Sequence, residues 1–161
     1  MKIYLDTTVL AVFTYFKNIE KQRYESVLKL FEICKKNNIK LITSFYALHE
    51  LFILPFNYFD KQKARKIGKE FIADVLKIEE MELIEFLSRE KRLLYQKKFE
   101  SIKDRTDIPH AISAFVERCD QIITYDSHFD KIADLIEVSS PEKFIKSNRR
   151  AKPQHGRAGD A

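Results

Sequence analysis

Four acidic residues stand at places where a folded chain can bring carboxylates together. Asp6 follows the apolar run IYL, Asp126 follows IITY, Glu50 lies within the apolar segment ALHELF, and Asp107 precedes Ile-Pro-His. Carboxylates that converge on one point repel one another unless a cation or protons neutralise them. Such oxygen ligands suit Mg²⁺ or Mn²⁺, and these ions serve phosphodiester chemistry by activating water and stabilising a leaving oxygen. The pattern predicts a divalent-metal site with hydrolytic chemistry.

Each acid also has a purely structural interpretation. Asp6 can cap a helix that follows the strand, and Asp107 suits the N-cap position of the helix after it. Glu50 can pair with a Lys or Arg in the core, because a lone buried carboxylate is costly. Asp126 can close an Asx turn. Four acids in such places are harder to explain by capping and pairing than any one alone, so the metal site is the leading hypothesis.

Short apolar runs that alternate with helical periodicity supply the elements that must position these acids. We expect strands over Lys2–Leu5, Lys40–Thr43, Gln121–Thr124 and Leu135–Val138. Helices are expected over Val9–Phe16, 20–36, from an N-cap at Ser44 through about Leu54, over 60–73 and 80–100, from Asp107 through Arg118, and as short turns after Asp126 and Ser140. Val75–Ile78 fits either a continued helix or a short strand.

Strands that alternate with helices predict an α/β fold with a mostly parallel sheet. In such a sheet, ligands bind at the carboxyl ends of the strands. Asp6 and Asp126 are placed there directly, and Glu50 lies about one helical turn beyond a third strand end. The apolar segment Leu41–Phe59 is long enough to raise the question of a membrane span. Glu50 at its centre and Pro55 near its end argue instead for a strand followed by a buried helix.

The order of these motifs resembles the PIN-domain family. The resemblance rests on IYLDTTVL at the start, TSFYALHEL after the second strand, DIPHAISA at a helix start, and IITYDSHFDKI at the end, and it covers residues 1–145. It implies a three-layer α/β/α sandwich with a metal site made of Asp6, Glu50, Asp107 and Asp126. Thr8 and Thr124 are implied as groups that hydrogen-bond a carboxylate or a metal-bound water. The small prokaryotic members are similar to VapC-type toxins, which cleave RNA and are held by an antitoxin protein.

Two other acids compete for places in this site. Asp130 lies in the same motif as Asp126, but only Asp126 comes directly after the strand. Asp104 is close to Asp107 and lacks the following His-x-x-x-Ala context. Asp126 and Asp107 are therefore the expected ligands.

Neighbouring residues suggest contacts to a nucleic acid. His110 lies three residues after Asp107, on the same helix face, where it could approach the metal or a phosphate or simply pack as a structural residue. Lys103 and Arg105, in a basic run with Lys97 and Lys98, could bind RNA phosphates or could be a solvated helix end. We expect His110, Lys103 and Arg105 as candidate RNA contacts.

Aromatic residues crowd around Pro55, and they suggest a protein partner or plain core. Phe52, Phe56, Tyr58 and Phe59 would form either core or an apolar patch for a homodimer or an antitoxin helix. We expect a homodimer.

Length and charge indicate how the chain is divided into a domain and a tail. A chain of 161 residues suits one domain, which we place at residues 1–145. Residues 146–161 carry five basic residues against Asp160 and account for +4 of the net charge of +5, so we expect a basic, disordered tail. Cys34 and Cys119 are too few for a disulfide framework and suit core positions in a reducing cytoplasm, and no secretory signal is recognisable.

Other chemistries find less support. The sequence has neither a Gly-x-x-x-x-Gly-Lys nor a Gly-x-Gly-x-x-Gly phosphate-binding loop. It also has no Gly-x-Ser-x-Gly elbow and no His/Cys cluster with zinc spacing. An aspartyl-phosphate phosphatase with Asp6 as nucleophile would need a second Asp two residues on, where Thr8 stands. A catalytically silent PIN-like module that binds RNA or protein is the other alternative. The sequence favours a Mg²⁺- or Mn²⁺-dependent endoribonuclease without membrane attachment, most similar to a toxin of a toxin–antitoxin pair.

Overall fold

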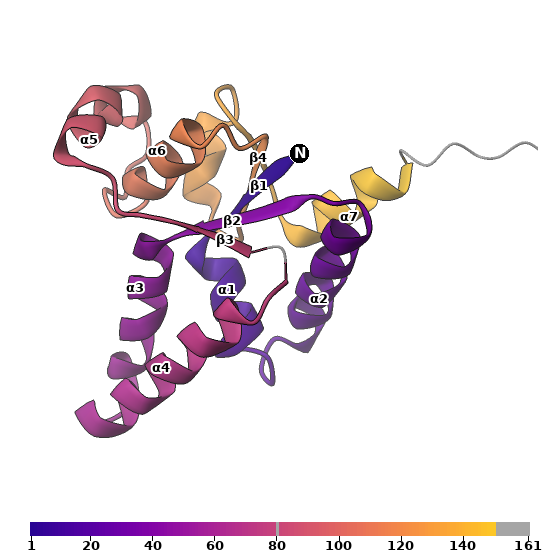
Figure 1. Cartoon of the computed structure of the whole chain (residues 1–161), viewed down its shortest axis with the longest axis vertical. Coiled ribbons are helices and arrows are strands. Elements are labelled where there is room, and N and C mark those ends of the chain that lie inside the picture. The colour runs from indigo at the N-terminus through magenta and orange to yellow at the C-terminus, as the bar shows by residue number, and fades with distance from the viewer. Residues whose placement is uncertain (80, 151–161) are drawn as a thin grey trace, which may run out of the picture.

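A parallel sheet forms the centre of the computed structural model, which describes residues 1–79 and 81–150 (Figure 1). Within that part, the strands are β1 (Lys2–Leu5), β2 (Lys40–Ser44), β3 (Met81–Ile84), β4 (Gln121–Ile123) and β5 (Glu137–Ser139). They lie in the order β3-β2-β1-β4-β5, and all neighbouring pairs are parallel. The chain adds strands on one side of β1 and then on the other, so the order reverses between β1 and β4. Such a switch point is where open α/β sheets bind ligands.

Helices cover both faces of the sheet. They are α1 (Thr7–Thr14), α2 (Lys21–Lys36), α3 (Phe45–Ile53), α4 (Lys61–Leu76), α5 (Arg89–Gln96), α6 (Ile108–Val116) and α7 (Pro141–Arg150), with the short 3₁₀ segments η1 (Leu54–Asn57), η2 (Lys97–Phe99) and η3 (Ser127–Ile132). In Figure 1, α1 to α4 lie below β2 and β3, and α5 and α6 lie above them.

The two faces follow from the alternation of side chains along each strand. Ile3 and Leu5 of β1 pack in a core with apolar residues of α1, α2, α3, α4 and α7. Tyr4, between them, packs on the opposite face with residues of η2, α6 and η3. The expected three-layer α/β/α fold with a parallel sheet is confirmed.

Most expected elements are present within a few residues of their predicted bounds. Ser44 caps α3 by accepting a hydrogen bond from the amide of Ala47, and the helix gives way to a 3₁₀ turn that contains Pro55. The segment Val75–Ile78 continues α4 only to Leu76 and forms no strand. Leu41–Phe59 is a strand and a helix as expected, and in the described residues no helix is long and apolar enough to cross a bilayer.

The predicted long helix over 80–100 is wrong. Met81–Ile84 forms the edge strand β3, whose residues pair with β2 from Leu41 to Ser44. A new helix, α5, then begins after Ser88, whose hydroxyl accepts from the amide of Lys91. The segment is rich in helix-forming Glu and Leu, but tertiary pairing outweighs that local preference because Met81 and Leu83 gain core contacts on β3.

The C-terminal boundary also differs from the expected one. Helix α7 runs from Pro141 to Arg150, so the boundary placed after residue 145 falls inside a helix. Phe144 and Ile145 are buried and attach α7 to the body of the protein. The sequence predicts a disordered tail over residues 146–161; residues 146–150 belong to α7 instead, and residues 151–161 lie outside the described residues. Cys34 and Cys119 are free, buried thiols, as expected.

Candidate active site

All four predicted acids line one open groove of about 620 Å³ at the carboxyl ends of the strands. Asp6 follows β1, Glu50 lies on α3 after β2, Asp107 precedes α6, and Asp126 lies beyond β4. The segments come from widely separated parts of the chain and meet beside the switch point between β1 and β4. The sheet topology therefore brings together carboxylates that the sequence places far apart.

Asp6 is the most buried of the four and is held by one of its two oxygens. Its Oδ2 accepts hydrogen bonds from the Thr8 amide at 3.2 Å, the Thr8 hydroxyl at 2.7 Å and the Thr124 hydroxyl at 2.9 Å. None of these bonds involves Oδ1, which lies 4.0 Å from His110 Nδ1. Asp6 does cap α1, as the structural interpretation expects, yet that role uses only Oδ2 and leaves Oδ1 available for a ligand.

Thr8 and Thr124 connect Asp6 to the loop that carries Asp126. The Thr124 hydroxyl donates to Asp6 and accepts from the amide of Asp126 at 2.9 Å. The Thr8 hydroxyl accepts from the amide of Tyr125 at 3.0 Å. Because both hydroxyls bridge β1 to the β4 loop, they fix the positions of two acids relative to each other.

Glu50 is held by a chain of hydrogen bonds that passes through His110. One carboxylate oxygen accepts from the Thr7 hydroxyl at 2.5 Å, and the other lies 3.1 Å from His110 Nε2. His110 Nδ1 lies 2.8 Å from the Tyr4 hydroxyl, which in turn lies 2.6 Å from the Ser44 hydroxyl. A neutral His110 that donates from Nε2 and accepts at Nδ1 satisfies this chain. Glu50 thus pairs with a histidine and not with the Lys or Arg of the structural alternative.

The same contacts shift the pKa values of both partners. Partial burial raises the pKa of Glu50, but the hydrogen bonds from His110 and Thr7 outweigh burial and leave it below its ordinary value. Burial alone would lower the pKa of His110. The hydrogen bond to Glu50 and the charge of Asp6 outweigh burial and leave this pKa above its ordinary value. Both shifts favour an ionised Glu50 facing the groove.

His110 is buried, in agreement with the alternative that it packs as a structural residue. Its side chain has no exposed surface, and both ring nitrogens are used by Tyr4 and Glu50. The helical spacing after Asp107 correctly brings it toward the site, but α6 points it into the protein, where it orients Glu50.

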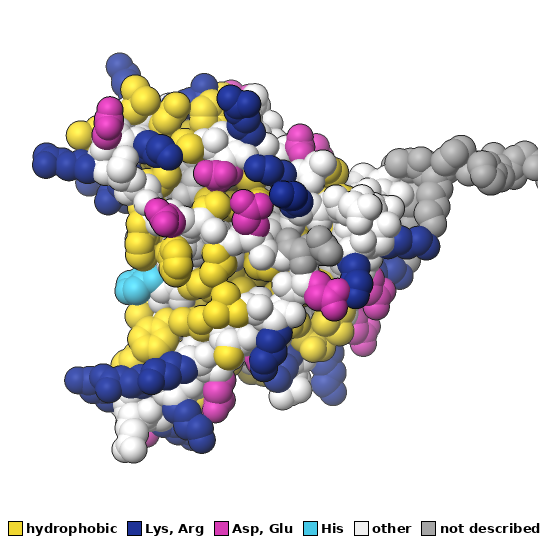
Figure 2. Space-filling view, viewed as in Figure 1, with side chains coloured by type: hydrophobic (Ala, Val, Ile, Leu, Met, Phe, Trp, Pro, Cys, Tyr) yellow, Lys and Arg dark blue, Asp and Glu magenta, His cyan; other side chains and the backbone are white. Residues whose placement is uncertain are grey.

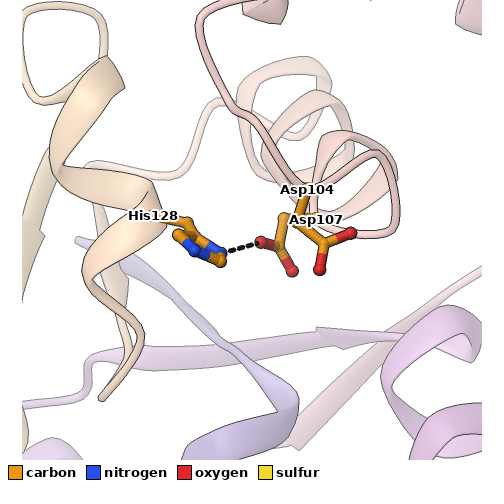
Figure 3. A group of neighbouring side chains, drawn as sticks. All are labelled: Asp104, Asp107 and His128. Atoms are coloured by element: carbon orange, nitrogen blue, oxygen red, sulfur yellow. Dashed lines mark hydrogen bonds and ion pairs between the residues drawn. The ribbon is translucent and has the colours of Figure 1, made fainter.

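Asp107 and Asp126 both contact His128. Figure 3 shows His128 pointing toward Asp107, and its Nδ1 lies 3.1 Å from Asp107 Oδ2. The same nitrogen lies 3.4 Å from Asp126 Oδ1, and the backbone amide of His128 donates to that oxygen at 2.8 Å. Partial burial and the charges of Asp126 and Asp6 raise the pKa of Asp107 to about 6, against the lowering effect of the His128 hydrogen bond. The Asp107 side chain makes no capping hydrogen bond, so capping does not account for it. A bound cation would relieve this crowding of negative charge.

The two rival acids lie differently. Asp104 Oδ1 accepts from the amide and hydroxyl of Thr106, at 2.9 and 2.8 Å. Ligand atoms of Asp104, Asp107 and His128 lie within 4.8 Å of one another, close enough to hold a metal ion together (Figure 3). Asp104 also lines the groove. Asp130 lines a different, smaller cavity, to which Asp126 and Lys143 also contribute. Asp126, and not Asp130, therefore faces the groove with the other acids.

Several residues of the groove carry no recognisable signal in the sequence. Arg23 of α2 lies with its guanidinium 4.5 Å from the centre of the Tyr125 ring and pairs with Glu20 at 2.7 Å. Among the described residues that line the groove, Arg23 has the one cationic side chain. The roles of Thr7 and of the buried Tyr4 behind the groove are likewise unpredictable from the sequence, because their partners lie more than 40 residues away.

The donor set fits a hard divalent cation. The carboxylates of Asp6, Glu50, Asp107 and Asp126 line the groove, and neither cysteine is among its lining residues. Oxygen-rich sites of this kind suit Mg²⁺ or Mn²⁺ better than zinc.

Comparisons with known proteins identify the fold. No family model matches the sequence, and no curated protein matches it. A chain in the crystal structure of VapBC2 from Rickettsia felis bound to a DNA fragment from its promoter superposes with a TM-score of 0.62 at 20% identity, over 87% of this chain and 98% of that one. A chain in the structure of VapBC-1 from nontypeable Haemophilus influenzae gives a TM-score of 0.56 at 18% identity, over 88% and 99%. This chain therefore has the fold of a component of VapBC complexes, as the PIN-like motifs led us to expect.

Proposed function

We propose that this protein is a Mg²⁺- or Mn²⁺-dependent endoribonuclease of the VapC type. The observation that carries the proposal is the groove that Asp6, Glu50, Asp107 and Asp126 line together, with the three hydrogen bonds to Asp6 all on Oδ2. The fold shared with chains of VapBC complexes supports the same assignment.

The residues of the groove have distinct roles in this proposal. Asp6, Glu50, Asp107 and Asp126 would hold the cation, which when bound supplies charge to activate water and to stabilise the leaving oxygen. Thr8 and Thr124 keep Asp6 and Asp126 in register, and His110 keeps Glu50 turned toward the groove. Such outer hydrogen bonds set the orientation of ligands and so contribute to metal affinity.

RNA is the proposed substrate, and the groove contains one group suited to a phosphate. The guanidinium of Arg23 is stacked on Tyr125 and half-exposed at the edge of the groove. Arginine binds phosphate through its planar fork of donors. Arg23 would therefore hold a phosphate of the bound strand on the side of α2.

Two protein partners belong to the same proposal. The neighbours in fold are VapBC assemblies, and by analogy an antitoxin protein would hold this chain. A second copy of the chain would cover apolar side chains that remain exposed around α3 and α5. Phe56 and Tyr58 are 38% and 57% exposed, so the aromatic group around Pro55 is only partly core. Phe45 and Phe86 form a second exposed aromatic pair at the start of α3, with ring centres 5.8 Å apart.

The test is cleavage of a mixed single-stranded RNA pool with Mn²⁺, with Mg²⁺ and with chelator. We expect the wild type to cleave only with metal and Asp6→Asn to lose cleavage while keeping its fold. Asp130→Asn is the matched control, because Asp130 lies outside the groove. Cleavage by Asp6→Asn at the wild-type rate would refute the site. RNA binding without any metal-dependent cleavage would favour the catalytically silent module instead.

A further inference from the structure

A second concave site lies next to the acidic groove and has the opposite charge. It is a pocket of about 600 Å³ between α5, η2 and the loop before α6, which we call the basic pocket. Lys97, Lys103 and Arg105 contribute its cations, and Ile102, Ile108 and Leu93 its apolar surface. Glu100 also lies at the pocket, so three positive charges face one negative charge.

One short loop separates the two sites and contributes to both. Asp104, Thr106 and Asp107 line the acidic groove, whereas Lys103 and Arg105 line the basic pocket. The chain thus alternates its side chains between the two cavities. A strand of nucleic acid that leaves the groove across this loop enters the basic pocket directly.

The cations of the pocket make no ion pair within the described part of the chain. In residues 1–79 and 81–150, the side chains of Lys97, Lys103 and Arg105 form no ion pair or hydrogen bond, and all three are exposed. Figure 2 shows Lys and Arg side chains around the α5 end of the molecule with hydrophobic side chains between them. Leu93 is 64% exposed, and Ile102 is buried beneath. Cations around an apolar surface suit a nucleotide, whose phosphate binds the charges while its base packs on the aliphatic groups.

We propose that the basic pocket is an RNA-anchoring subsite, which binds a nucleotide that flanks the cleavage site. This inference rests on the proposed nuclease function for its place in the reaction, and on the pocket itself for its chemistry. The acidic groove repels phosphates until a cation is bound, so the basic pocket supplies the first attraction for the strand. Lys97, Lys103 and Arg105 are binding residues in this account and do not take part in bond cleavage.

The decisive experiment measures RNA binding without cleavage. Anisotropy of a labelled mixed-sequence 20-mer RNA is recorded in chelator, over a range of salt concentrations, for the wild type and for Lys97→Gln/Lys103→Gln/Arg105→Gln. The matched control is Arg65→Gln/Lys66→Gln/Lys69→Gln, which removes the same charge from exposed positions of α4 that line neither cavity. Circular dichroism and thermal unfolding verify that both variants are folded.

Each phosphate contact contributes roughly 0.7 to the slope of log affinity against log salt for single strands, so three contacts contribute roughly 2. The wild type should therefore lose about 20-fold more affinity than the pocket variant over a fourfold rise in salt. Equal changes in the pocket variant and the α4 control would show an effect of overall charge and overturn the inference. An unchanged RNA slope with lost affinity for a polyglutamate peptide would assign the pocket to an acidic protein partner and overturn it as well.

A cleavage measurement separates this inference from the nuclease proposal. With metal present, the pocket variant should lose at least several-fold more kcat/KM on a long RNA than on a tetranucleotide, because only the long strand reaches the pocket. An equal loss on both lengths would contradict the subsite. If the wild type cleaves neither RNA, the nuclease proposal fails, while the salt dependence of binding still decides whether the pocket anchors RNA.

Discussion

Thr124→Val tests whether the hydrogen bonds behind the acids maintain the site. Valine has nearly the shape of threonine, and Thr124 is only 4% exposed, so the change removes one hydroxyl from a packed position. That hydroxyl donates to Asp6 Oδ2 at 2.9 Å and accepts from the Asp126 amide at 2.9 Å. The substitution therefore loosens two of the four acids at once.

The magnitude follows from the two lost bonds. A hydrogen bond to a charged carboxylate contributes roughly 1.5–3 kcal/mol, and one between neutral groups roughly 0.5–1.5 kcal/mol. We expect the free energy of unfolding to fall by roughly 2–4 kcal/mol, which corresponds to a Tm lower by about 4–16 °C for a chain of this size. The affinity for Mn²⁺ should fall about 10- to 100-fold, as for other partners of metal ligands.

The assay is thermal unfolding of Thr124→Val with and without Mn²⁺, beside the control Thr14→Val. Thr14 is also buried, and its hydroxyl donates at 2.8 Å to the carbonyl of Leu10 within α1, away from the acids. The control should lose stability modestly and respond to Mn²⁺ like the wild type. If Thr124→Val binds Mn²⁺ with wild-type affinity, the hydroxyl does not position the acids and the reasoning is refuted.

Three further predictions concern charge, packing and assembly. The pKa of Asp107 in the folded protein is about 6, above the 3.8 of an ordinary Asp. The metal-free folded state therefore takes up a proton before the unfolded chain does, and its free energy of unfolding should rise as the pH falls through 6. Asp107→Asn should lack that rise in a pH series of thermal unfolding. A Cβ at Gly68 would lie 2.5 Å from the Phe52 carbonyl oxygen. Gly68→Ala should therefore lower the free energy of unfolding by roughly 1–3 kcal/mol through the α3–α4 contact, despite alanine's better helix propensity; an unchanged or higher Tm would contradict this. Light scattering should find a dimer that Phe86→Ser, but not the control Leu76→Ser, converts to a monomer; a monomeric wild type would contradict the homodimer.

The sequence predicts that the four acids lie together because each stands next to a strong local signal. Asp6 and Asp126 follow short apolar strands, and the parallel topology then brings strand ends together. The Ser44 cap and Pro55 likewise frame the helix that carries Glu50. These features depend on residues close together in the chain, so pattern and propensity are sufficient to find them.

Other features of the fold and the site depend on long-range contacts, which local sequence patterns do not predict. β3 exists because Met81–Ile84 pairs with β2, although its own residues favour a helix. His110 lies where its spacing from Asp107 suggests, but its burial between Tyr4 and Glu50 follows only from the packing of α6 on the sheet. Arg23 lines the groove only because α2 packs beside the β4 loop, where Tyr125 holds it. The division of Lys103–Asp107 between two cavities is similarly a property of the folded loop.

We expect the acidic groove to bind a divalent ion through Asp6. A titration of the wild type and Asp6→Asn with Mn²⁺, followed by unfolding, tests it most directly. At 100 times its Kd, an ion that binds only the native state adds about 2.7 kcal/mol to the free energy of unfolding. We predict that the wild type gains stability in this way and Asp6→Asn gains little. Equal gains in both proteins, or none in the wild type, would contradict the metal site.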